Sequence, residues 1–140
     1  MIYIPPIPEL SVYGVVDAGI PNKERICLRP SEEVNLAHFG IFLAIRNSET
    51  GGMTPLQDHF FWFGEQLVSP PAWLIVFTGT GERRTITEQE VTVHVYYWNK
   101  KHILFDVPNV TIVPVVFRIA SIHMIPLLPN PEQVKHLSSK

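Results

Sequence analysis

The chain has 140 residues, of which 46% are hydrophobic and 17% are charged, and its formal net charge is −2. This size fits one domain with a substantial core, and the hydrophobic content excludes a largely disordered chain. Only 11 basic residues stand against 13 acidic ones, so the chain lacks the basic surplus that neutralises nucleic-acid phosphates. We therefore expect no nucleic-acid partner.

Cysteine usage and the absence of long apolar runs indicate the compartment. Cys27 is the single cysteine, which rules out an internal disulfide and a cysteine-based zinc cluster. Residues 1–6 carry no positive segment followed by an apolar stretch, and the longest wholly apolar run, residues 72–77, is too short to cross a bilayer. The sequence predicts a cytoplasmic protein with no membrane partner.

The first half of the chain predicts an arm followed by strands. Residues 1–10 are rich in proline and predict an extended arm rather than a core element. Residues 47–55 are polar, include Gly51-Gly52, and predict a loop. Strands are predicted over residues 11–16, 25–28, 34–46 (bent at Gly40) and 60–63.

The second half has the strongest strand signal. Valines at positions 91, 93 and 95 alternate with polar residues, which is the two-residue period of a pleated strand over 91–98. Residues 103–105 are predicted to be the returning arm of a hairpin. The remaining predicted strands cover residues 72–78, 83–87 and 110–123, and Pro114 places the last at an edge, a bulge or a corner.

These spacings predict an all-β fold: an antiparallel β-sandwich or barrel, jelly-roll-like, of roughly eight to ten short strands. A single β domain is expected over residues 11–125. Residues 126–140 predict a tail or a short helix, because Asn130 can cap it and Pro131 suits its first position.

No pattern in the chain predicts a metal, a cofactor or a catalytic nucleophile. The six histidines include no pair spaced to share one face of a strand or helix. Gly79-Thr80-Gly81 follows an apolar strand, but a third glycine is missing and the next residues are β-like, so we interpret it as a loop. The Gly-x-Ser-x-Gly signature is absent, and Cys27 lies inside a predicted strand. We expect no catalytic residues.

The aromatic residues are the most unusual feature. They occur in runs at 60–63, 73–77 and 96–98, and alternate side chains of a strand point to opposite faces. One interpretation is a core on one face and a subunit interface or ligand pocket on the other; the alternative is a core on both faces. The candidate ligand-binding residues are His94, Tyr96 and Trp98, which share one strand face, together with His59, Trp62 and Trp73.

Two functions follow from these features. The preferred one is a non-enzymatic binding or homo-oligomeric assembly module whose N-terminal arm, residues 1–8, adds to a sheet edge of a neighbour. Its partner would be a second copy or another protein. The alternative is a small-molecule barrel, with or without a metal, that binds or transforms its ligand in an aromatic pocket.

Overall fold

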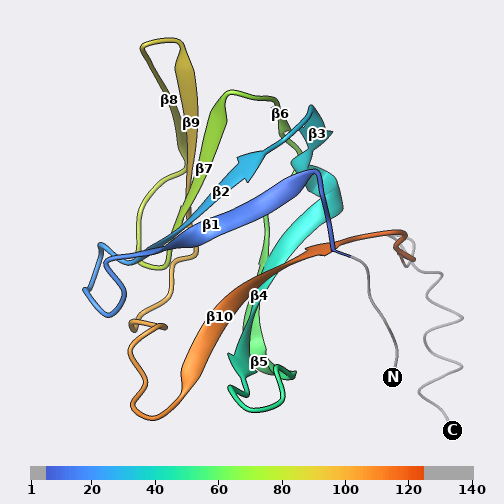
Figure 1. Cartoon of the computed structure of the whole chain (residues 1–140). Helices are drawn as coiled ribbons and strands as arrows, with labels where there is room; N and C mark the ends of the chain where they lie inside the picture. Colours follow the sequence, from blue (N-terminus) through green and yellow to red (C-terminus); the bar gives the residue numbers. More distant parts are fainter. Residues whose placement is uncertain (1–5, 125–140) are drawn as a thin grey trace, which may run out of the picture.

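The structure, a computed structural model, describes residues 6–124, and within this range it is nearly all β (Figure 1). The predicted all-β fold is confirmed. The only helix of this part is a short 3-10 turn, η1, at Leu36–His38. The strands are β1 Leu10–Val16, β2 Arg25–Pro30, β3 Val34–Asn35, β4 Phe39–Arg46, β5 Met53–Trp62, β6 Leu67–Val68, β7 Ala72–Phe77, β8 Arg84–Glu88, β9 Val91–Tyr97 and β10 Thr111–Arg118.

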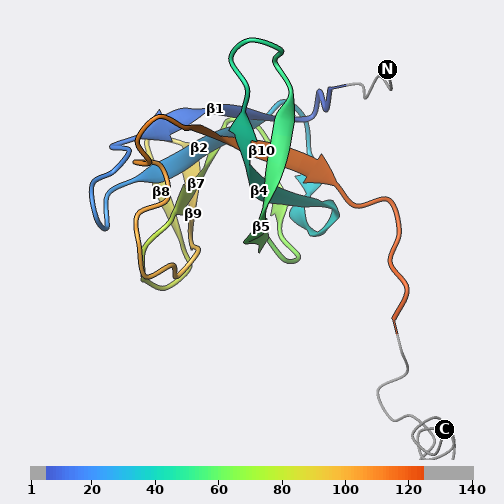
Figure 2. The same cartoon turned by 90° about the horizontal axis from the view of Figure 1, so that it is seen from below.

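The strands form three sheets. A five-stranded sheet has the order β1-β2-β7-β9-β8, a three-stranded sheet has the order β10-β4-β5, and β3 pairs with β6. Strands β1 and β10 lie next to each other and bring the two larger sheets together along one side (Figures 1 and 2). Arg118 at the end of β10 forms an ion pair with Glu9, just before β1. The arrangement is sandwich-like and does not close into a barrel.

One strand pair departs from the antiparallel pattern. Strand β9 lies between β7 and β8, antiparallel to β8 but parallel to β7. After β7, the chain passes to the edge of the sheet and forms β8 there, one strand position away from β7. The β8–β9 hairpin then places β9 in the position between β7 and β8. This placement buries His94, Val95 and Tyr96 in the middle of the sheet.

The core lies between the inner faces of the two larger sheets. Alternate residues of β2 and β7 are completely buried, as are Ile41 and Leu43 of β4, and each such side chain contributes about 1.5–3 kcal/mol of burial free energy. The core side chains are Leu10, Ile26, Leu28, Val34, Leu36, Phe39, Ile41, Leu43, Phe63, Val68, Leu74, Val76, Tyr96 and Leu104.

Three local predictions were wrong in detail. The 34–46 segment breaks at η1 rather than at Gly40, because the Asn35 side chain accepts a hydrogen bond from the Ala37 amide and starts a helical turn. Strand β5 begins at Met53, inside the predicted loop, because residues 53–55 pair with β4. Residues 103–105 form no strand, since the backbone amides of Leu104 and Phe105 donate to a buried carboxylate instead.

The prediction for Pro114 agrees with the structure. Pro114 lies in β10, which is an edge strand of its sheet, as its missing backbone donor requires. The described part of the predicted arm does not stand apart from the core: Ile7 packs against it, Leu10 is a buried residue of β1, and the Pro8 carbonyl accepts a hydrogen bond from Ser31. The rest of the arm and the helix predicted within 126–140 lie outside the described residues. No helix between residues 6 and 124 has the length and hydrophobicity needed to span a membrane.

Candidate functional site

Three of the six predicted ligand residues lie in or against the core. Tyr96 is buried, and its ring centroid is 5.3 Å from that of Phe63 and 6.0 Å from that of Phe61. The Trp98 ring lies 5.6 Å from Phe61. The side chains of Phe61, Phe63, Tyr96 and Trp98 thus pack against one another between β5 and β9.

The polar atoms of this cluster are engaged by neighbouring side chains. His94 Nδ1 lies 3.3 Å from the Thr85 hydroxyl, and burial, assisted by the charge of Arg83, lowers the pKa of His94 below its usual value. The Arg83 guanidinium lies 4.6 Å from the centre of the Tyr96 ring and donates to its hydroxyl. Burial raises the Tyr96 pKa despite this cation. The polar contacts of His94 and Tyr96 are therefore made within the protein, which indicates a structural role.

Of the other three predicted ligand residues, Trp73 and Trp62 lie on other surfaces, whereas His59 is close to Lys100, whose ammonium is 5.8 Å from the Trp98 ring. Trp73 is on the outer face of the five-stranded sheet, under the Arg29 guanidinium at 4.4 Å. Trp62 is exposed on the three-stranded sheet. His59 is half-buried in β5 with its Nδ1 buried and without a partner, and burial, assisted by Lys100, lowers its pKa. Trp62 and Trp73 therefore do not join His94, Tyr96 and Trp98 in one site.

Within residues 6–124, no group of three or more His, Cys, Asp or Glu side chains is placed to hold a metal ion. The thiol of Cys27 is free and half-buried, and burial raises its pKa although Arg25 opposes the shift. A raised pKa leaves little thiolate at neutral pH, so this thiol is a weak nucleophile.

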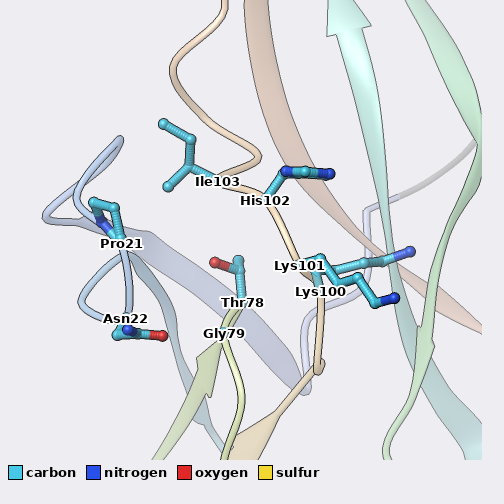
Figure 3. Close-up of a pocket in the computed structure, with 8 residues that line it drawn as sticks. All are labelled: Pro21, Asn22, Thr78, Gly79, Lys100, Lys101, His102 and Ile103. Atoms are coloured by element: carbon cyan, nitrogen blue, oxygen red, sulfur yellow. The ribbon is translucent and has the colours of Figure 1, made fainter.

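A shallow hollow of about 290 Å³ lies between the loop at Pro21-Asn22 and the segments that follow β7 and β9. Figure 3 shows the side chains of Lys100 and Lys101 extending away from Thr78 and Asn22. The Lys100 ammonium donates to the Asp58 backbone carbonyl at 2.7 Å. The lysines therefore do not concentrate positive charge in the hollow, and it is a poor anion site.

Glu24, beside this hollow, is a residue whose importance the sequence did not reveal. Its side chain is fully buried and accepts four hydrogen bonds. Oε1 accepts from the amides of Gly19 (3.0 Å) and Phe105 (3.3 Å). Oε2 accepts from the Thr78 hydroxyl (2.5 Å) and the Leu104 amide (2.7 Å). One carboxylate thus ties three loops together, which is a structural role.

The outer face of the three-stranded sheet is the best candidate for a functional surface. Strand register places Phe42 opposite Phe60 on β5 and opposite Val115 on β10, and directly paired residues project on the same side. The rings of Phe42, Phe60 and Phe117 lie 5.7–6.3 Å apart. Phe60 and Trp62 are 58% and 60% exposed. We call the set Phe42, Phe60, Trp62, Val113, Val115 and Phe117 the aromatic face.

Gly40 allows this cluster to form. A Cβ at position 40 would lie 2.5 Å from the Phe117 ring and 2.7 Å from the Phe61 carbonyl oxygen. The ring of Phe117 therefore lies directly over the backbone of β4, in a space that only glycine leaves open.

An apolar groove of about 570 Å³ continues the aromatic face at one end. Trp62 belongs to both surfaces, and its indole N–H donates to the Ala37 carbonyl at 2.9 Å, which fixes the ring. We call this the terminal groove; its lining residues are Ala37, His38, Trp62, Ile119, Ala120, Ser121, Ile122 and Met124.

Comparisons with known proteins add no functional information. No protein-family model matches the chain, and neither the curated proteins nor the solved structures compared with it give a significant match. The aromatic face and the terminal groove are therefore interpreted from their own chemistry.

Proposed function

We propose that this protein is a non-enzymatic assembly module that associates with copies of itself through the aromatic face. The observation that carries the proposal is the cluster of Phe42, Phe60 and Phe117, flanked by Trp62, in which Phe60 and Trp62 are exposed and Phe42 and Phe117 are half-buried. A contiguous apolar patch of this kind on a small domain is typical of an interaction surface, and exposed aromatic residues are enriched in such surfaces.

Composition and shape favour a second copy as the partner. The charged fraction of 17% is low for a globular chain, which reduces the repulsion between like molecules. A sheet face is close to flat, so two copies can place the same residues against each other around a two-fold axis. Phe60, the exposed aromatic residue beside Phe42 of the central strand β4, would then pack against the partner's aromatic residues.

The size of the face sets an expectation for affinity. Strands β4 and β10 each have 8 residues. At ~3.3 Å per residue and ~4.8 Å between strands, the face measures roughly 26 by 14 Å, or about 370 Å². A standard interface takes about 800 Å² from each partner. The face alone supplies about half of this area and supports a weak dimer.

The experiment is sedimentation velocity over a range of protein concentrations, with Phe60→Ser and Tyr13→Ser as matched variants. Both aromatic residues are mostly exposed, at 58% and 64%, so neither change opens the core. Tyr13 lies on the other sheet. Phe60→Ser is expected to raise the dissociation constant at least tenfold, as for the loss of an aromatic anchor, and Tyr13→Ser to leave it unchanged. A wild-type chain that stays monomeric at every concentration contradicts the proposal.

A second candidate, a small-molecule site, rests on the terminal groove, whose volume of about 570 Å³ is within the usual range for ligand pockets. Native mass spectrometry separates the two functions, because it reports the subunit number and any retained molecule together. A stoichiometric small-molecule adduct on a monomer supports this candidate. As part of the main proposal we place the protein in the cytoplasm, where a free thiol such as Cys27 stays reduced.

A further inference from the structure

Strand β8 is an open edge of the five-stranded sheet. Among residues 6–124, β9 is the only strand hydrogen-bonded to it, and Figure 1 shows the β8–β9 hairpin at the outer end of the sheet. All five residues of β8, Arg84–Glu88, are exposed. The free edge of a strand carries unpaired backbone N–H and C=O groups, which can pair with a further strand.

The other edge strands of the two larger sheets are each interrupted. Strand β1 has a bulge between Val12 and Gly14, and β10 contains Pro114 and lies beside β1. Strand β5 contains Pro55 and has an irregular register with β4. In contrast, β8 pairs with β9 in continuous register and contains no proline or lysine. Bulges, prolines and lysines prevent pairing between edges, and β8 has none of the three.

The sequence of β8 is complementary to itself. When two copies of Arg-Thr-Ile-Thr-Glu run antiparallel, Ile86 lies opposite Ile86, each Thr85 opposite a Thr87, and each Arg84 opposite a Glu88. Arg84 and Glu88 are about 13 Å apart along their own strand and cannot pair with each other there. Within residues 6–124 neither of them forms an ion pair. Directly opposed residues of opposite charge stabilise a pair of strands, as do opposed threonines.

The side chains of β8 are on the faces that this pairing needs. Thr85 contacts His94 on the core side of the sheet, so alternation puts Arg84, Ile86 and Glu88 on the outer face. Ile86 is 37% exposed there. Directly opposed residues of an antiparallel pair project from the same face. The two Ile86 side chains would therefore touch, with an Arg84–Glu88 pair on each side of them.

We infer that β8 pairs antiparallel with β8 of a second copy, about a two-fold axis at Ile86, and joins two five-stranded sheets into one of ten strands. The inference goes beyond the proposed function, because β8 and the aromatic face belong to different sheets. A copy that uses both surfaces has two neighbours, so assemblies larger than a dimer can form. The paired segment is about 17 Å long, shorter than the aromatic face, so this contact is the weaker of the two.

Charge exchange tests the pairing in a Phe60→Ser background, in which association through the aromatic face is weakened. Arg84→Glu places a glutamate opposite Glu88 of the other copy, and Glu88→Arg places an arginine opposite Arg84. Each variant is expected to raise the dissociation constant of the remaining dimer at least fivefold, by sedimentation velocity at high protein concentration and low salt. An equimolar mixture of the two variants should recover the parent affinity, because each glutamate then faces an arginine.

Two controls separate strand register from net charge. The double variant Arg84→Glu with Glu88→Arg keeps the net charge of the parent and reverses both pairs, so it should dimerise as the parent does. Lys23→Glu changes the net charge as much as Arg84→Glu does. It lies in the exposed loop between β1 and β2, on the opposite side of the sheet, and should leave the dissociation constant unchanged. Since every residue of β8 is exposed, the fold should be retained in all variants.

The outcomes separate this inference from the proposed function. If Arg84→Glu acts no more strongly than Lys23→Glu, or the mixture fails to recover affinity, the β8 pairing is wrong. If the wild-type chain dimerises but the Phe60→Ser chain is monomeric at every concentration, the β8 pairing is wrong and association through the aromatic face stands. If the Phe60→Ser chain dimerises as tightly as the wild type and charge exchange weakens that dimer, the β8 pairing stands and the proposed role of the aromatic face is wrong.

Discussion

Glu24→Gln tests whether one buried carboxylate holds three loops together. The carboxylate has two acceptor oxygens, and each accepts two hydrogen bonds. Glutamine has the same shape but replaces one oxygen with an NH₂ group, which is a donor. Whichever way the amide is turned, its NH₂ faces at least one backbone N–H, either that of Leu104 or those of Gly19 and Phe105.

The structure sets the magnitude of the effect. A buried N–H without an acceptor costs about 1–3 kcal/mol, and hydrogen bonds to a charged group contribute about 1.5–3 kcal/mol against about 1 kcal/mol for neutral pairs. The substitution therefore lowers the free energy of unfolding by about 3 kcal/mol. This is a large share of the ~5–15 kcal/mol that holds a domain folded, and it lowers the melting temperature by roughly 10 °C.

Urea denaturation followed by tryptophan fluorescence measures this loss. The transition midpoint should fall with an unchanged slope, which indicates lost stability rather than a change in two-state behaviour. The control is Glu88→Gln, at the exposed end of β8, where the glutamate side chain has no hydrogen bond or ion pair with the described residues. A loss below about 1 kcal/mol for Glu24→Gln, equal to that of the control, would refute the idea that the carboxylate joins the loops.

Three further predictions concern the free energy of unfolding, measured in the same assay, and the reactivity of the Cys27 thiol. Gly40→Ala should lower the free energy of unfolding by about 1–3 kcal/mol, because the added methyl group overlaps the Phe117 ring; no loss would show that the ring moves freely. The pKa of His94 is lowered on folding, so below the unfolded pKa of ~6.5 the unfolded state binds more protons. Stability should therefore fall as the pH drops from 7 to 5, and His94→Asn should reduce that slope; an unchanged slope contradicts the assignment. Alkylation of Cys27 by iodoacetamide should be slower than that of a free peptide thiol at pH 8 and should accelerate above pH 9, since burial raises its pKa; a rate equal to that of the peptide refutes this.

The sequence predicts strands wherever the signal is local. The alternation from Val91 to Tyr97 specifies β9, and the apolar run 72–77 specifies β7. The first half of β5 carries no such signal, because Met53-Thr54-Pro55 lacks a strand's alternation and includes a proline; these residues are extended through pairing with β4. Leu104 and Phe105 look like a strand locally, but their amides bond to Glu24, more than 75 residues earlier. Contacts at that separation cannot be read from local patterns.

The candidate surface was predictable only in part. Alternation in the run 60–63 indicates that Phe60 and Trp62 share one face and Phe61 the other. Which of these faces is buried depends on which sheet packs against it, and the meeting of Phe60 with Phe117 depends on the strand order β10-β4-β5. The predicted grouping of Trp62 and Trp73 with His94 failed for the same reason, because these residues belong to different sheets or to opposite faces.

The outer faces of the two larger sheets differ in how their aromatic side chains are covered. The five-stranded sheet also has aromatic residues outside, but the Arg29 guanidinium lies over Trp73 at 4.4 Å and that of Arg25 lies 5.6 Å from the Phe77 ring. Such cation–π contacts, at about 0.5–2 kcal/mol each, cover the rings while keeping the charge in water. Among the described residues no cation lies over Phe60 in this way. Arginine side chains of the five-stranded sheet thus lie over the rings of Trp73 and Phe77, whereas Phe60 on the three-stranded sheet has no such cover, which supports the proposal that the aromatic face binds another molecule.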